Sequence, residues 1–354
     1  MNQKKKRLHI ALILVFILFL VFSIASFVFI KINFDDMFGR TERKEYSCYL
    51  RYEDVEEQYD RELLSFSSGE NQLQGYLYGT ENKKGLIVIS HGLGGGAESY
   101  IAETLYFVGH DYQVFGYDNT GCYESEGKNS VGLSQSVIDL DAALSYIEKE
   151  SRFDGIPVFL YGHSWGGYAV TAIFNYNHEI AGSVSIAGFN KPMSMILEWT
   201  KGMMGNFAYV EYPYIYLYQK MLFGKNTNMS AVDGINNTDT PILIIHGNKD
   251  TTVGYEGAGT IAYRDEITNP NVQYKICDGE KQNDHNRLFM SLDAIAYGKK
   301  LDADYDKLQK QYNENISKEI DAEFCANVDK EKLSALDENF MQDVLTFYDS
   351  AVKR

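Results

Sequence analysis

The strongest constraint on the fold is an uninterrupted apolar run near the N-terminus. Residues 8–30 carry no acidic or basic side chain apart from a neutral His9. As an α-helix, these 23 residues would be about 34 Å long, which is enough to cross the hydrocarbon core of a bilayer. A secretory signal peptide also combines a basic start with an apolar stretch, but its apolar stretch is shorter. We therefore expect a single uncleaved transmembrane helix at residues 8–30.

The charges around this run predict its orientation. Lys4–Arg7 precede it, whereas Lys31 is the only basic residue between the run and Asp35. Basic flanks stay on the cytoplasmic side of a membrane. We therefore expect a single-pass protein of the cell membrane, with a cytoplasmic tail at residues 1–7 and an extracytoplasmic domain. Without these five bases, 28 basic residues face 49 acidic ones, a net charge of −21. Such a domain lacks the basic surface that nucleic acid requires, so we expect no nucleic-acid partner.

Beyond the anchor, apolar strand-like runs alternate with helix-like segments. We expect a stalk at residues 31–65 and one domain at residues 66–354. The expected strands lie at residues 73–78, 86–89, 113–117, 157–161, 180–187, 241–245 and 272–276. Helical patterns between them predict an α/β fold with a doubly wound, mostly parallel sheet.

Two segments interrupt this alternation. Residues 189–237, rich in Met and Tyr, are too long for a crossover loop, so we interpret them as a cap inserted between two strands. An additional helical layer without substrate contact is the alternative. Residues 288–354 form an extension, with helices expected at 302–321 and 330–352.

The four cysteines leave several arrangements open. Cys48, Cys122, Cys277 and Cys325 allow free thiols or disulfides, and an extracytoplasmic location permits disulfide formation. The sequence has no CxxC pair, no HExxH motif and no close pair of histidines, so we expect no structural or catalytic metal.

A motif typical of nucleophilic catalysis follows the expected strand at 157–161. The residues Gly162-His163-Ser164-Trp165-Gly166 match the pattern G-x-S-x-G between a strand and a helix. A sharp turn at this place exposes the serine hydroxyl above the sheet, and small neighbours let the backbone approach closely. The pattern predicts Ser164 as a nucleophile.

A serine nucleophile needs a base and an orienting carboxylate. Asp250 follows the strand at 241–245, and His285 lies in the polar loop after the strand at 272–276. Their order in the chain, Ser164, Asp250 and His285, is the order that this fold type uses. The competing carboxylates are Asp233, Asp239, Asp278 and Asp284, with Glu198 a poorer candidate.

Acyl transfer also needs hydrogen-bond donors for the oxygen that becomes negative. The loop Ser90-His91-Gly92-Leu93-Gly94-Gly95-Gly96 follows the strand at 86–89, so we expect the backbone N–H groups of Leu93 and Trp165 to form an oxyanion hole. Phosphate binding is the alternative for a glycine-rich loop, but the spacing matches neither the dinucleotide nor the Walker pattern.

Together these motifs resemble the α/β-hydrolase superfamily, in particular bacterial serine-aminopeptidase-like and monoacylglycerol-lipase-like hydrolases. The resemblance covers about Leu73 to Arg287. The family's loop after the fourth strand, D-x-R-G-x-G-x-S-x-G, corresponds to residues 118–127, where Thr120 replaces the Arg and Tyr123 the second Gly. These departures weaken any transfer of substrate specificity. The resemblance implies an α/β-hydrolase fold with a helical cap.

We therefore expect a membrane-anchored serine hydrolase, esterase-like or lipase-like, that cleaves an ester, thioester or amide through an acyl-Ser164 intermediate. The expected partners are a small-molecule, peptide or lipid acyl substrate and the membrane itself, and no cofactor is expected. The tyrosines of the cap suggest an apolar or aromatic acyl group. Two alternatives remain: an acyltransferase with the same nucleophile, and a catalytically silent binding domain with the same fold.

Overall fold

The computed structural model describes residues 3–352 and contains one eight-stranded sheet. The strands follow the order β1-β2-β4-β3-β5-β6-β7-β8, antiparallel from β1 to β4 and parallel from β4 to β8. Their bounds are β1 Arg61–Ser68, β2 Asn71–Tyr78, β3 Leu86–Ser90, β4 Gln113–Tyr117, β5 Val158–His163, β6 Gly182–Ile186, β7 Ile242–Gly247 and β8 Val272–Cys277. The predicted doubly wound, mostly parallel sheet is confirmed.

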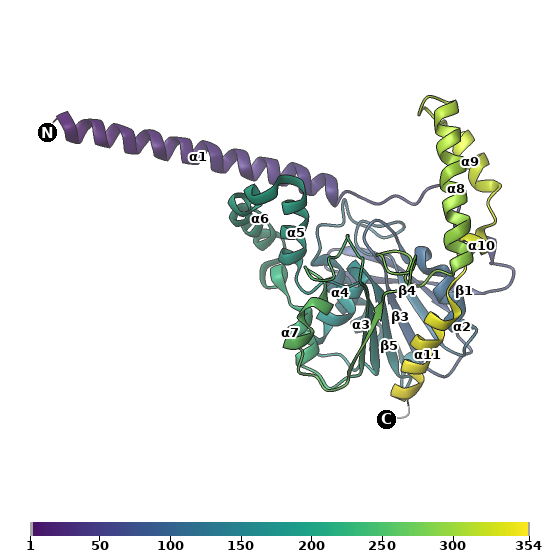
Figure 1. Ribbon diagram of the computed structural model, residues 1–354. Coiled ribbons are helices and arrows are strands. Elements are labelled where there is room, and N and C mark those ends of the chain that lie inside the picture. Colours follow the sequence, from purple (N-terminus) through teal and green to yellow (C-terminus); the bar gives the residue numbers. More distant parts are fainter. Residues whose placement is uncertain (1–2, 353–354) are drawn as a thin grey trace.

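Helices cover both faces of this sheet, as Figure 1 shows. Side chains along β3 alternate between the two faces: Leu86 and Val88 join one core cluster, whereas Ile87 and Ile89 join the other. The first cluster includes α3 (Gln135–Ile147) and α4 (Trp165–Ala172), and the second includes α2 (Ile101–Val108) and α11 (Glu338–Val352). Because β3 is buried on both faces, its residues form the continuous apolar run seen in the sequence.

A single helix, α1 (Gln3–Met37), contains the apolar run and projects from the body of the molecule (Figure 1). It is long and apolar enough to cross a membrane. Its side chains are mostly exposed, and only Ser26, Ile30 and Phe34 are buried. The helix continues seven residues beyond the expected end of the span, because Asn33 and Asp36 follow without a glycine or proline that would end it.

The segment expected to be a stalk is divided among three structural elements. Its first part belongs to α1, and its last residues form β1, the edge strand of the sheet. The part between them packs on the domain: the Arg40 guanidinium donates to the carbonyl of Ser125 at 2.8 Å, and Cys48 forms a disulfide with Cys325. Residues 31–65 therefore do not form a separate stalk.

The chain between β6 and β7 forms three helices, α5 (Pro192–Met204), α6 (Ala208–Phe223) and α7 (Ala231–Asn236). In Figure 1, α5 and α6 lie beneath the C-terminal half of α1 and beside the sheet. We call residues 189–237 the cap. Tyr214 and Tyr218 of α6 make edge-to-face contacts with Phe22 and Phe27 of α1.

After β8 the chain forms α8 (Leu292–Gln311), α9 (Lys318–Ala326), α10 (Lys330–Leu333) and α11. The single helix expected at 302–321 is therefore wrong, because the Ser317 side chain accepts from the Ile320 N–H and starts a new helix. The helix expected at 330–352 is likewise broken, since the Asp337 carboxylate accepts from the Phe340 N–H and starts α11.

Candidate active site

Ser164 occupies the turn between β5 and α4. Its φ of +57° is unfavourable for a residue with a side chain, and the turn persists because the surrounding backbone is close-packed. A Cβ atom on Gly166 would lie 1.8 Å from the Ser90 carbonyl oxygen, and one on Gly162 would lie 2.3 Å from the Gly166 oxygen. Both glycines of the motif are therefore required for this approach, and the serine is held at the carboxyl end of the sheet.

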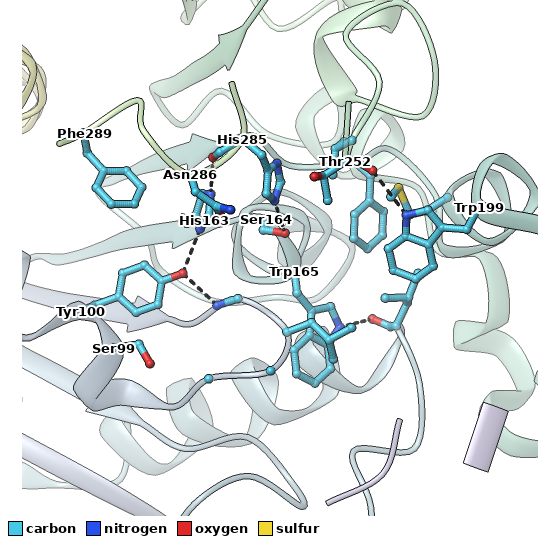
Figure 2. Close-up of a pocket in the computed structure, with 18 residues that line it drawn as sticks. Ser99, Tyr100, His163, Ser164, Trp165, Trp199, Thr252, His285, Asn286 and Phe289 are labelled. Carbon is cyan, nitrogen blue, oxygen red and sulfur yellow. Dashed lines mark hydrogen bonds between the residues drawn. The ribbon is translucent and has the colours of Figure 1, made fainter. Parts of the chain in front are cut away.

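The structure brings the three predicted residues together. His285 Nε2 lies 2.9 Å from Ser164 Oγ, and His285 Nδ1 lies 2.7 Å from Asp250 Oδ2. Asp250 follows β7 and His285 follows β8, so the two residues come from adjacent strand ends. Figure 2 shows the imidazole of His285 directed at the Ser164 hydroxyl. With the Nδ1 proton donated to the carboxylate, Nε2 is the acceptor for the hydroxyl proton.

Of the candidate carboxylates, Asp250 is the one that contacts His285. Its side chain is fully buried and also accepts from the N–H groups of Thr252 and Val253 at 2.8 and 2.9 Å. Burial alone would raise the pKa of Asp250, but hydrogen bonds from His246 and His285 outweigh it and hold the pKa well below its usual range. The carboxylate is therefore ionised and fixed in place.

His246 also lies against this carboxylate. Its Nε2 donates to the Val253 carbonyl at 2.9 Å and lies 3.3 Å from Asp250 Oδ2. The carboxylate is thus held from two sides, by His246 and by His285. The position of His246 directly after a strand was visible in the sequence, but its contact with Asp250 was not.

The expected oxyanion donors lie on either side of Ser164. Leu93 belongs to the loop after β3, Trp165 is the first residue of α4, and both line the cavity around Ser164. Among the hydrogen bonds of residues 3–352, the backbone N–H groups of Leu93 and Trp165 donate to no protein acceptor. The Trp165 indole donates instead to the Leu133 carbonyl at 2.8 Å, which turns the ring away from Ser164 (Figure 2).

The loop after β4 holds in place the oxyanion loop, by which we mean residues 90–96 after β3. The carboxylate of Asp118 accepts from the Ala97 N–H at 2.8 Å, and the Asn119 N–H donates to His91 Nε2 at 2.9 Å. Burial raises the pKa of Asp118 to about 6 and lowers that of His91 to about 4. His91 therefore stays neutral near pH 7, and its Nε2 is an acceptor that links the loop after β3 to the loop after β4.

His163 links two parts of the site, which the sequence did not indicate. Its Nε2 donates to the His285 carbonyl at 2.9 Å, and its Nδ1 accepts from the Tyr100 hydroxyl at 2.9 Å. That hydroxyl in turn accepts from the Gly92 N–H at 3.1 Å. Burial lowers the pKa of His163 to about 3, so the ring is neutral and can both donate and accept. The chain of hydrogen bonds, drawn in Figure 2, joins the oxyanion loop to the loop of His285.

Glu198 of α5 was a poorer candidate for the carboxylate that orients His285. Its side chain instead binds the loop that follows Asp250. Its carboxylate accepts from the Gly254 N–H at 2.9 Å and from the Ala258 N–H at 2.6 Å. These residues belong to the loop that begins at Asp250. No sequence signal could have revealed this contact, because Glu198 and Gly254 are separated by 56 residues and an entire strand.

A cavity of about 460 Å³ opens over Ser164. Its walls combine polar groups around Ser164 with apolar and aromatic side chains, to which the cap contributes Phe189, Met195 and Trp199. The tyrosines of α6 do not line it, so the expectation that they would form the acyl-group walls is wrong. Tyr214 and Tyr218 pack against α1 instead, because α6 lies on the side of the cap that faces α1.

The parallel sheet, the turn that carries Ser164 and the loops that converge on it at the carboxyl edge define the α/β-hydrolase fold. The family model described as "Serine aminopeptidase, S33" matches residues 81–233. The chain therefore has the α/β-hydrolase fold, and residues 81–233 are similar to this hydrolase family.

The curated relatives match shorter regions. Human monoglyceride lipase is 35% identical over 88 residues, which is 25% of this chain and 29% of the lipase. The quorum-quenching protein AidA of Acinetobacter baumannii is 29% identical over 156 residues, 40% of this chain and 50% of that protein. The chain thus spans half or less of the length of these relatives.

Among solved structures, the esterase Pf2001 of Pyrococcus furiosus has the same fold, with a TM-score of 0.53 and 16% identity. The similarity covers 77% of this chain and 98% of the esterase.

Proposed function

We propose that this protein is a membrane-anchored serine hydrolase that cleaves an ester, thioester or amide through an acyl-Ser164 intermediate. The observation that carries the proposal is the continuous hydrogen-bonded series from Ser164 Oγ through His285 to Asp250. A serine hydroxyl is a weak nucleophile until a base within hydrogen-bond reach takes its proton, and His285 Nε2 lies at that distance.

In the first half of the reaction, Ser164 Oγ attacks the carbonyl carbon and His285 Nε2 takes the hydroxyl proton. The negative oxygen of the tetrahedral intermediate accepts from the backbone N–H groups of Leu93 and Trp165. The ionised Asp250 stabilises the positive charge on the imidazole. His285 then gives its proton to the leaving alcohol, thiol or amine, and the acyl group remains on Ser164.

In the second half, water attacks the acyl-enzyme. His285 takes one proton from the water and returns it to Ser164 Oγ as the acid product leaves. The apolar side of the cavity that Phe189, Met195 and Trp199 form favours an apolar group beside the reacting carbonyl. Names of similar proteins, a lipase and an esterase, are consistent with an ester substrate.

The proposal is tested by labelling the full chain with a fluorophosphonate probe, which reacts with activated serines. We expect the wild type to be labelled and Ser164→Ala to remain unlabelled, with the same circular dichroism spectrum. A folded wild-type protein that is not labelled would contradict the assignment of Ser164 as the nucleophile. A panel of p-nitrophenyl esters and aminoacyl amides then separates esterase from peptidase activity.

We also propose that the domain lies outside the cytoplasm. The bases before α1 and the Cys48–Cys325 disulfide both support this side, since disulfides persist in oxidising compartments. Protease added to intact spheroplasts that express the full chain should degrade the domain. Protection until the membrane is dissolved would place the domain in the cytoplasm.

A further inference from the structure

The contact between α1 and the cap lies within the predicted membrane span. Ser23 Oγ and Tyr214 Oη of α6 are 2.9 Å apart, and Ser26 Oγ donates to the Glu211 carboxylate at 3.1 Å. Both serines belong to the last third of residues 8–30. At 1.5 Å rise per residue, Ser23 lies about 10 Å below the end of the span. If α1 crosses a bilayer, α6 therefore lies in the outer part of that bilayer.

The outward surface of the cap has the chemistry for this position. Apolar side chains of α6 and the turn before it are exposed, and they include Phe207, Val210, Leu217, Met221 and Leu222. Between Lys201 and Lys220 the only charged residue is Glu211, which is buried. An apolar surface of this extent marks a membrane or protein contact, and tyrosines such as those of α6 are enriched at membrane interfaces. Because this apolar surface continues onto the predicted membrane span of α1, contact with lipid is favoured over contact with a protein.

A second cavity, of about 240 Å³, lies between α1 and the cap. Phe29, Phe34 and Met37 of α1 form one wall, and Met203 and Ile215 of the cap contribute to the other. These side chains are apolar, and the cavity lies at the end of the span that meets the cap. Its surface matches a hydrocarbon chain.

Three polar residues, Asn33, Thr200 and Glu211, also line this cavity, and the side chains of Asn33 and Thr200 donate to backbone carbonyls of their own helices. Glu211 is 4% exposed, and its Oε1 accepts from Ser26. Its Oε2 lacks a hydrogen-bond partner among the residues that the structure describes, and Glu211 belongs to the cavity lining. A buried acceptor without a donor is unfavourable, and a ligand that supplies a donor restores the missing bond. The ligand that fits both features has an apolar chain and a hydroxyl group.

Helix α5 lies between this cavity and the cavity over Ser164 and contributes residues to both. Trp199 lines both of them. On the same helix, Met195 faces the Ser164 cavity and Ile196 faces the α1 cavity. The Trp199 indole donates to the Thr252 carbonyl at 3.3 Å, a long bond that a rotation of the side chain would break. Figure 2 shows the indole at the side of the Ser164 cavity that α5 forms.

We propose that the cavity between α1 and the cap binds a single-chain, hydroxyl-bearing lipid from the outer part of the bilayer. The hydroxyl donates to Glu211 Oε2, and the chain lies against α1 and α5. Rotation of Trp199 joins this site to the Ser164 cavity, so that a membrane lipid reaches the nucleophile without passing through water. The passage to Ser164 rests on the proposed function, whereas lipid binding does not.

The test uses the full chain in phospholipid nanodiscs and a long-chain alcohol that carries a diazirine near its hydroxyl end. After illumination, mass spectrometry locates the labelled residues. We expect labels concentrated at residues 29–37 and on α5, displaced by excess unlabelled alcohol. Labels spread evenly along α1 would show general contact with lipid and overturn the proposal. Use of Ser164→Ala protein keeps this result independent of the proposed function, because binding needs no reaction.

Two variants test the polar contact and the cavity separately. Glu211→Met removes both carboxylate oxygens and keeps an unbranched side chain of similar length. We expect labelling by the alcohol to fall about tenfold, the loss of one hydrogen bond to a charged group, while labelling by the matching methyl ether is retained. Ile215→Trp fills the cavity and should abolish both. Leu217→Ala, on the exposed surface of α6, is the control and should leave both unchanged. Equal labelling of wild type and Ile215→Trp would overturn the proposal.

Discussion

Replacement of Glu198 should lower turnover although this residue does not touch the cavity over Ser164. Its carboxylate is the acceptor for two backbone N–H groups, at Gly254 and Ala258, in the loop that begins at Asp250. A hydrogen bond to a charged group contributes about 1.5–3 kcal/mol when it is buried. Because Glu198 is only partly buried, we take the lower end of this range for one bond and assume that water replaces part of the other. The two bonds then stabilise the ordered loop by about 2–3 kcal/mol.

This free energy corresponds to a decrease of about 30- to 160-fold in the population of the ordered loop. We expect kcat to fall by up to that factor in Glu198→Ala and by less in Glu198→Gln, which keeps one acceptor oxygen. KM should change little, since Glu198 does not line the cavity. The assay is hydrolysis of a short-chain p-nitrophenyl ester by the full chain in detergent, with thermal unfolding measured in parallel.

Glu256 provides the matched control, because it is an exposed glutamate in the same loop. Glu256→Gln should retain wild-type turnover. A folded Glu198→Ala protein whose kcat lies within twofold of wild type would refute the view that α5 positions the acid. An equal decrease in Glu256→Gln would show that the loop responds to any loss of charge.

Three further predictions concern charge and covalent connection. Asp250→Asn should lower kcat about 10⁴-fold with little change in unfolding temperature, and retained turnover would assign the acid elsewhere. Burial raises the pKa of Glu103 to about 7 from 4.5, so the folded state holds this proton more tightly and loses stability as pH rises through that interval. Glu103→Gln should therefore be more stable than wild type by about 3 kcal/mol at pH 8 but not at pH 4, measured by urea unfolding; equal differences at both pH values would exclude this cause. Cys48→Ser opens a loop spanning 277 residues, and the free energy of unfolding should fall by about 6 kcal/mol by the chain-entropy relation, whereas Cys277→Ser should unfold like wild type.

The central strands of the sheet could be predicted from sequence because they are buried on both faces. Such strands form continuous apolar runs, and residues 86–89 and 241–245 are examples. β1 was missed because it is an edge strand with an irregular pattern of exposure, so its sequence resembles that of a polar segment. The breaks near Ser317 and Asp337 were missed for another reason: each depends on one side chain that caps a helix.

The candidate site was predicted where local sequence dictates geometry. The turn at Ser164 needs glycines at fixed positions, and Asp250 and His285 follow strands whose ends meet at one edge. Contacts between segments that are distant in the sequence have no local motif that would predict them. The hydrogen bonds of Glu198 to the acid's loop and of His163 to the His285 carbonyl depend on how separate elements pack. The packing of α1 against α6 could not be read from the sequence for the same reason.

The continuity of α1 has a consequence for where this protein can act. The helix runs without a break from Gln3 to Met37, and the domain begins to pack directly after it. Under the proposed membrane placement, the catalytic opening is therefore carried on a rigid support and cannot swing outward on a flexible arm. The protein samples the plane of the membrane by lateral diffusion while Ser164 stays at one height above it. Only molecules that present their reactive carbonyl at that height would be within its reach.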